Sequence, residues 1–241
     1  MKSLKIKKTI LLKKTLLFLM IVSLFLSEIV LSVNEIIGFS MYSAIIIGIL
    51  ITLSKSKSID DYSKLGIFLI ILPIIRLTSL FLQFEIFWNT LIIYNLLLFL
   101  VTFYTIKFKI DIGYTKKRLS LLVLIIPLGV VLGFIGNMFF NSGGNYWMLF
   151  LLPLAAYSEE VLFRGLIQKH IKKIYGGLNS VIFTALLFCI FSLGLSLNVI
   201  FLLFAVGLIL GVIYYFTENI FLTITLNMIL NLFIFVLPKI M

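Results

Sequence analysis

Two adjacent glutamates and a nearby arginine stand inside a long apolar stretch of the sequence. The run SEEVLFRG contains Glu159, Glu160 and Arg164. On a helix Glu160 and Arg164 are neighbours at i,i+4, whereas Glu159 points about 100° away from Glu160. We therefore expect the guanidinium to hold Glu160 while Glu159 stays free. Adjacent carboxylates repel each other in a medium of low dielectric constant, so one of them becomes a better proton acceptor, as a general base requires.

The same cluster admits two other interpretations. Glu160 and Arg164 could form a buried ion pair that only fixes helix packing, with Glu159 hydrogen-bonded across a helix bundle. Acidic clusters inside membrane proteins also serve as ion or proton sites. The residue types therefore mark a site, but their spacing alone does not select its chemistry.

A second polar face lies near the end of the chain. The run LTITLNMILNLF places Asn227 and Asn231 at i,i+4, with Thr223 one turn earlier. At 1.5 Å per residue, Asn227 and the glutamates lie at similar depths, roughly 13–15 Å from the basic ends of their helices. We expect them to share one hollow, in which the amides could donate hydrogen bonds to a carboxylate or to a developing oxyanion. The alternative is that the asparagines merely join two helices.

Between these two segments, the run FTALLFCIFSLGLSL places Phe188 and Ser192 at i,i+4, with Cys189 beside them. Packing is the more common role of a serine in a membrane helix, and no histidine is positioned to activate this one as a nucleophile. Cys189 is interpreted as a small core residue. The single histidine, His170, lies among lysines and is predicted to be a surface residue near a helix end. One histidine and two carboxylates are a poor zinc set, so neither a metal nor a cofactor is predicted.

Two further charges, Glu28 in LFLSEIVL and Arg76 in IILPIIRLTSL, interrupt other apolar runs. Unpaired charges are disfavoured in such surroundings. A salt bridge between these two residues is therefore the economical prediction.

The elements that must position these residues follow from composition. Of the 241 residues, 62% are hydrophobic and only 12% are charged, and the mean hydropathy is +1.24; a soluble domain has about 25% charged residues. The apolar runs are continuous rather than alternating, which favours helices over a membrane barrel. The sequence thus predicts an all-α, polytopic transmembrane bundle of about eight or nine spans, near residues 15–33, 36–53, 65–84, 86–106, 119–140, 146–168, 178–196, 199–217 and 219–237.

Positive charge predicts the orientation of these spans. Lysines crowd the N-terminal run MKSLKIKKTILLKK, which we interpret as the flank of a retained anchor, and most other basic residues fall in alternate connections. The pattern predicts a cytoplasmic N-terminus in an integral, plasma-membrane protein. The net charge of +11 then indicates lipid headgroups rather than nucleic acid as the partner. The basic stretch Lys107–Lys117 divides four leading spans, 1–106, from a C-terminal core, 107–241.

These residues resemble the CPBP family, the CAAX proteases and bacteriocin-processing proteins also called Abi, over about residues 107–237. The family pattern is Glu-Glu-x-x-x-Arg on one span, Phe-x-x-x-His on the next and His-x-x-x-Asn on a later one. The first motif is intact, and the others align with Phe188 and Ser192, which the resemblance implies are binding residues, and with Asn227 and Asn231. Both histidine positions, 192 and 227, therefore hold other residues.

The resemblance implies a membrane-embedded endopeptidase. Glu159 would activate water, with support from Glu160 and Arg164, while the residues at the histidine positions and Asn231 would assist and hold the oxyanion. Losing one oxyanion donor costs about 10²–10³ in rate, and losing a general acid or base about 10²–10⁴. The resemblance thus predicts a peptidase of weak or altered activity on a membrane-bound peptide or protein. The alternative is an inactive binding protein, such as a bacteriocin immunity factor or a scaffold for a partner helix.

Overall fold

The computed structural model describes residues 2–54, 60–82, 85–115, 118–139, 146–191 and 197–237, and in these residues the regular structure is entirely helical. The predicted all-helical membrane bundle is confirmed. Over the described ranges, six segments are long and apolar enough to cross a membrane: Leu11–Val33, Glu35–Ser54, Asp61–Phe81, Phe87–Lys107, Leu119–Met138 and Ile200–Thr217. The helices that carry them are α1 (Lys2–Val33), α2 (Glu35–Ser54), α3 (Asp61–Phe81), α4 (Ile86–Lys107), α5 (Leu122–Phe139), which follows the 3₁₀ turn η1 (Leu119–Leu121), and α9 (Leu197–Thr217).

The remaining helices are shorter and lie among the long ones. They are α6 (Met148–Glu160), the π-helical segment η2 (Val161–Gln168), α7 (Lys169–Tyr175), α8 (Gly177–Phe191), α10 (Ile220–Asn231) and the π-helical turn η3 (Leu232–Val236). Three of them, α6, η2 and α7, follow one another without a break, so the predicted span 146–168 is the first part of a longer rod. The rod changes its winding directly after Glu160, because η2 has π rather than α hydrogen bonding.

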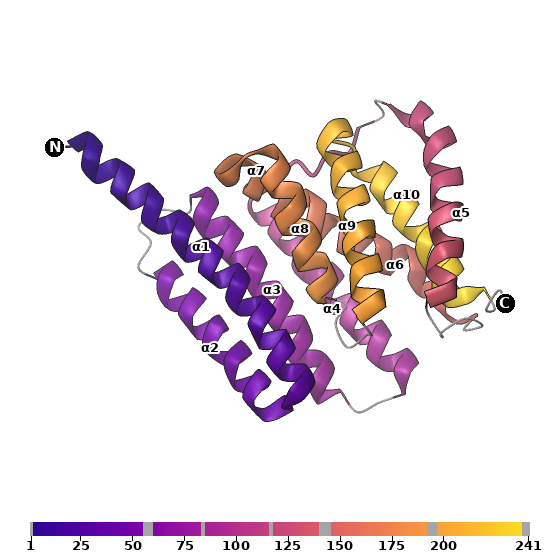
Figure 1. Ribbon diagram of the computed structural model, residues 1–241, viewed down its shortest axis with the longest axis horizontal. Helices are drawn as coiled ribbons and strands as arrows, with labels where there is room; N and C mark the ends of the chain where they lie inside the picture. Colours follow the sequence, from indigo (N-terminus) through magenta and orange to yellow (C-terminus); the bar gives the residue numbers. More distant parts are fainter. Residues whose placement is uncertain are drawn as a thin grey trace.

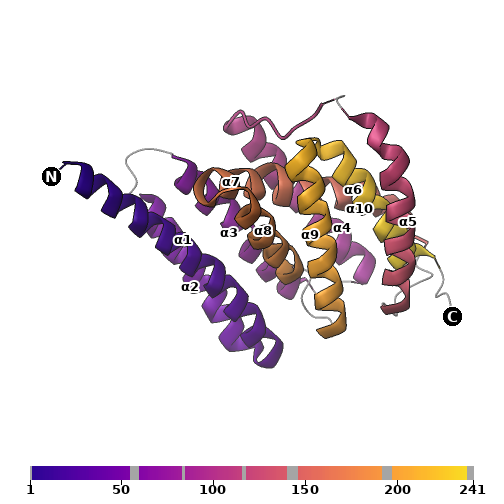
Figure 2. The ribbon, with the colours of Figure 1, turned by 45° about the horizontal axis from the view of Figure 1, so that its top comes forward.

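The bundle places α6 at its centre (Figure 1). Helices α1 and α2 pack together at one side and α5 stands at the other, next to α10. Helix α6 contacts both α4 and α10, and α8 packs along α9. The turned view in Figure 2 keeps α7 at the same end of the bundle as the connection between α9 and α10. Three segments far apart in the sequence, α4, α6 and α10, can therefore contribute side chains to one site.

The predicted salt bridge between Glu28 and Arg76 is confirmed. Arg76 Nη2 lies 2.6 Å from Glu28 Oε1, and the Tyr42 hydroxyl donates a hydrogen bond to Glu28 Oε2. Glu28 is 2% exposed, so the carboxylate is held inside the bundle by one cation and one hydroxyl. This arrangement ties α1, α2 and α3 together at a depth where an unpaired charge is costly.

Candidate functional site

The paired glutamates lie in the middle of the bundle, at the end of α6. Glu160 has no exposed surface and Glu159 is only 7% exposed. At 1.5 Å per residue, Glu159 lies about 17 Å along the helix from Met148. The prediction that an ion pair holds Glu160 is confirmed, since Arg164 Nη1 lies 3.2 Å from Glu160 Oε1 and both side chains are fully buried.

Two more contacts hold the Arg164 guanidinium. Its Nη2 donates to the Gly207 carbonyl of α9 at 3.3 Å, and its carbon lies 4.7 Å from the centre of the Phe188 ring. Gly207 allows α9 to approach α8 closely, because a Cβ there would stand 3.1 Å from Ala185 Cα. Phe188, predicted to bind a ligand, is 4% exposed and packs against this cation. Its binding role stays a prediction.

The Asn227 side chain bridges the two carboxylates. Its Nδ2 donates to Glu159 Oε2 and to Glu160 Oε1, at 3.1 Å in each case. Asn231, one turn further along α10, donates to Asn227 Oδ1 at 3.3 Å. The expected meeting of the acids with the final helix is therefore confirmed, while the catalytic roles assigned to these residues stay predictions.

The expectation that Glu159 stays free is wrong, and the alternative geometry, in which Glu159 is hydrogen-bonded across the bundle, agrees with the structure. Besides the bond from Asn227, its Oε1 accepts a hydrogen bond of 2.8 Å from the Tyr94 hydroxyl on α4. A buried carboxylate needs such donors, because it has left the water that would solvate it. The motif pattern did not include Tyr94. One feature of the sequence could have identified Tyr94 as a site residue. It lies in the middle of the apolar run LIIYNLLLFL, far from the headgroup level where membrane tyrosines gather.

Tyr94 also connects the site to a cavity. A space of about 200 Å³ between α3, α4 and the end of α8 is lined by Ile75, Arg76, Ser79, Thr90, Ile93, Tyr94 and Phe191. Neither the glutamates nor Asn227 line this cavity, so it is not the hollow that these residues were expected to share. Glu159 and Glu160 themselves are almost completely enclosed. Any polar molecule in the cavity could reach the Tyr94 side chain, which is bonded to Glu159.

The remaining candidates lie elsewhere or outside the described residues. Ser192 falls in the undescribed segment 192–196. Cys189 is 2% exposed, which agrees with a core residue. The prediction that His170 is a surface residue is wrong: it is 2% exposed, its Nδ1 lies 2.7 Å from the Leu166 carbonyl oxygen, and its ring packs edge-on against Phe68. Among the described residues, no three His, Cys, Asp or Glu side chains gather as a metal site would require.

Comparison with known proteins gives one match. Residues 141–233 match the family model described as type II CAAX prenyl endopeptidase Rce1-like. The match is narrower than the expected 107–237, and it contains the glutamates, the arginine and the two asparagines but not Tyr94. No curated protein and no solved structure matches the chain.

Proposed function

The chain belongs to the CPBP/CAAX family through residues 141–233, and from this premise we propose that it is a membrane-embedded peptide hydrolase of weak activity. Its substrate is a peptide or protein segment at the membrane. The observation that carries the proposal is the position of Glu159, which two donors from different helices hold at fixed distances. A base held in one orientation in an enclosed site is what general base catalysis requires.

In the proposed reaction, water enters from the cavity behind Tyr94 and gives one proton to Glu159. Its oxygen bonds to the carbonyl carbon of the peptide, and the resulting oxyanion collapses as the bond from carbon to nitrogen breaks. Glu159 then returns the proton to the leaving nitrogen. One carboxylic acid and one amine result, so atoms and charge balance without another reactant.

The hydrogen bonds indicate different roles for Asn227 and Asn231. An amide NH₂ group has two hydrogens, and Asn227 directs both of them at the glutamates. Asn227 is therefore a positioning residue. Asn231 donates one hydrogen to Asn227 and keeps the other for the oxyanion. This assignment separates two residues that were both predicted to act as amide donors.

The replacement of both motif histidines supports the proposal that the activity is weak. Ser192 and Asn227 stand at the positions where the family has histidine, and neither side chain can exchange a proton near neutral pH as imidazole does. Arg164 and Glu160 neutralise each other, which leaves Glu159 as the only acid in the cluster available to carry protons. The expected rate is lower than that of an intact family site by at least about 10².

The test is cleavage by the purified full chain in proteoliposomes, with prenylated and unprenylated membrane-proximal peptides. Glu159→Gln should abolish cleavage and leave the melting temperature close to that of the parent. Asn227→His and Ser192→His, singly and together, should raise the rate. If the parent and all histidine variants are as inactive as Glu159→Gln over the whole peptide set, the proposal is wrong.

One observation favours a second candidate, a binding protein without catalysis. Both oxygens of Glu159 already accept hydrogen bonds, so Glu159 ties α4, α6 and α10 together without a ligand. In this case the protein would act as an immunity factor or scaffold that grips a partner helix. Co-purification of that partner would then survive Glu159→Gln, whereas the peptidase proposal requires the cellular effect to disappear with the same change.

The proposed location is the plasma membrane, with the N-terminus in the cytoplasm. The concentration of lysines in the N-terminal segment supports this orientation. A protease-cleavable tag at the N-terminus should resist protease added to intact cells and become sensitive once the cells are opened. Cleavage in intact cells would reverse the orientation.

A further inference from the structure

A polar cavity lies at the basic end of the bundle, away from the glutamates. Its volume is about 300 Å³, at the lower end of the range for small-molecule sites. Three segments form it: the strap that joins α4 to α5, the start of α7, and the turn between α9 and α10. Its lining residues are Asp111, Gly113, Tyr114, Thr115, Gln168, Lys169, Lys172, Tyr214, Tyr215, Thr217 and Glu218.

Hydrogen bonds fix the strap, residues 111–115, against the turn between α9 and α10. The Ile220 amide donates to the Gly113 carbonyl at 3.1 Å, and the Asn219 side chain donates to the Thr115 carbonyl at 2.9 Å. Gly113 has a φ of +84°, and a Cβ there would stand 2.2 Å from the Glu218 backbone oxygen. Glycine is therefore required at this crossing, and the wall of the cavity is a built feature of the fold.

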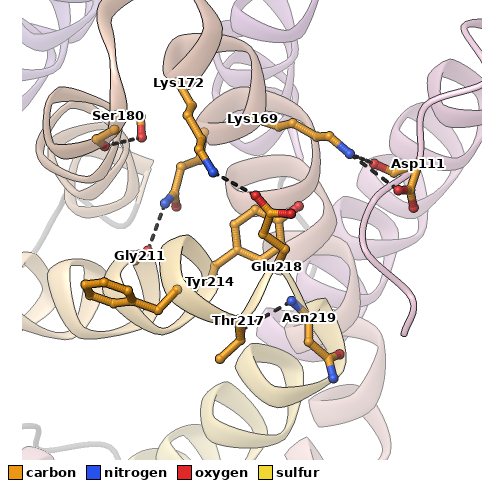
Figure 3. Close-up of polar contacts among 12 residues, drawn as sticks. Asp111, Lys169, Lys172, Ser180, Gly211, Tyr214, Thr217, Glu218 and Asn219 are labelled. Carbon is orange, nitrogen blue, oxygen red and sulfur yellow. Dashed lines mark hydrogen bonds and ion pairs between the residues drawn. The ribbon is translucent and has the colours of Figure 1, made fainter. Parts of the chain in front are cut away.

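Charges of both signs surround the cavity. Lys172 Nζ lies 2.7 Å from Glu218 Oε1, and Lys169 Nζ lies 3.7 Å from Asp111 Oδ2. Figure 3 shows the two lysines reaching these acids from α7. All four side chains are at least one-third exposed, so each pair is weak and can exchange its partner for a ligand. Hydrogen bonding to Lys172, aided by its charge, lowers the pKa of Glu218, which keeps the carboxylate ionised.

One buried acceptor in the wall is left without a donor. Gln168 is 1% exposed, and its Nε2 donates to the Gly211 carbonyl at 2.8 Å. Its Oε1 has no hydrogen-bond partner within the described part of the chain. An unsatisfied buried acceptor is destabilising, so a ligand with a hydrogen to donate gains free energy here. This observation is independent of the ion pairs at the rim.

The balance of charge selects the ligand. Two lysines attract an anion, but Asp111 and Glu218 repel one, so a simple anion gains little. A ligand with a phosphate and a primary ammonium pairs with both sets and can donate to Gln168 Oε1. The cavity lies beside α7, whose lysines mark the level at which lipid headgroups are expected. We propose that this cavity binds the phosphoethanolamine headgroup of a membrane phospholipid, with its acyl chains outside in the bilayer.

The test is native mass spectrometry of the full chain in detergent, titrated with dioleoyl-phosphatidylethanolamine, -phosphatidylcholine and -phosphatidylglycerol. Phosphatidylcholine has no ammonium hydrogen to donate, and phosphatidylglycerol has no cation. We expect one site that binds phosphatidylethanolamine at least about tenfold more tightly than either, the ratio for one charge-assisted hydrogen bond. Equal binding of all three lipids would overturn the proposal.

Variants locate the site. Lys172→Gln should weaken the binding of all three lipids, because each carries the phosphate that Lys172 contacts, and Glu218→Gln should shift the preference toward phosphatidylglycerol. The matched control is Lys173→Gln, since Lys173 is also on α7 and also pairs with an acid, Asp61 at 3.1 Å, but does not line the cavity. A loss of lipid affinity in the control equal to that in Lys172→Gln would contradict the assignment.

Soluble competitors separate the headgroup from a free anion. Glycerophosphoethanolamine should displace the lipid and raise the melting temperature of the parent protein but not that of Lys172→Gln. Inorganic phosphate at the same concentration should do neither. Equal displacement by phosphate would show a general anion site and would overturn the headgroup assignment. None of these measurements depends on peptide cleavage.

Discussion

Replacing Glu160 by glutamine should destabilise the bundle more than any single change on its lipid-facing surface. The change removes the negative charge at 3.2 Å from Arg164 and leaves a guanidinium with no exposed surface. Its described contacts would then be the Gly207 carbonyl and the rings of Phe163 and Phe188. Stranding one partner of a buried ion pair costs about 3–5 kcal/mol.

The lower part of that range is expected for this pair. Glu159 stays in the same cluster, joined to Glu160 through Asn227, and supplies some of the lost negative charge. We therefore expect a loss of about 3 kcal/mol in the free energy of unfolding. Because a buried ion pair gains little over apolar side chains, the double variant Glu160→Gln with Arg164→Leu should lose less than the sum of the single variants.

The assay is reversible unfolding in mixed micelles of mild detergent and SDS. It compares the parent protein, Glu160→Gln, Arg164→Leu and the double variant. Leu149→Ala is the reference, since Leu149 lies on α6 and is 46% exposed. A loss for Glu160→Gln no larger than that of the reference would refute the argument. So would strict additivity in the double variant, because it would mean that Glu160 and Arg164 do not interact.

Three further changes test other parts of the structure. Tyr94→Phe should lower the cleavage rate by about 10–100-fold through loss of one hydrogen bond to a charged group, whereas Tyr104→Phe on the same helix should leave it unchanged. Burial lowers the pKa of His170 from its ordinary 6.5. The neutral imidazole therefore stabilises the fold above pH 6.5, and this stability falls as the pH drops below 6.5 toward the folded-state pKa. His170→Gln should accordingly flatten the dependence of the melting temperature on pH below 6.5. Gly113→Ala should destabilise the protein by about 1–3 kcal/mol, since positive φ disfavours a side chain, and should speed proteolysis of the strap, unlike Gly48→Ala, where a Cβ meets no atom within 4 Å.

The helices and the acidic cluster could be predicted from sequence because both depend on local patterns. Continuous apolar runs specify membrane helices, and i,i+4 spacing specified the contact between Glu160 and Arg164. The pairing of Glu28 with Arg76 followed from the cost of isolated charge in the same surroundings. The division of the chain at residue 107 stays a prediction.

These sequence patterns could not predict contacts between helices that are distant in the sequence. Tyr94 contacts Glu159 only because α4 packs against α6, and no spacing rule relates residues in separate helices. His170 was predicted to be exposed because its neighbours in sequence are lysines. Its burial depends on Phe68 of α3, which covers the ring while those lysines extend outward.

The change of winding at Val161–Gln168 alters the rotation of the central rod between the glutamates and α7. Each π turn takes up an extra residue compared with an α turn, so the part after Gln168 leaves at a different rotation from the part before Val161. Gaining or losing a single position in this segment would therefore turn α7 relative to the glutamates. The segment thus sets the angle between the buried glutamates and the lysines of α7 that line the cavity at the basic end of the bundle.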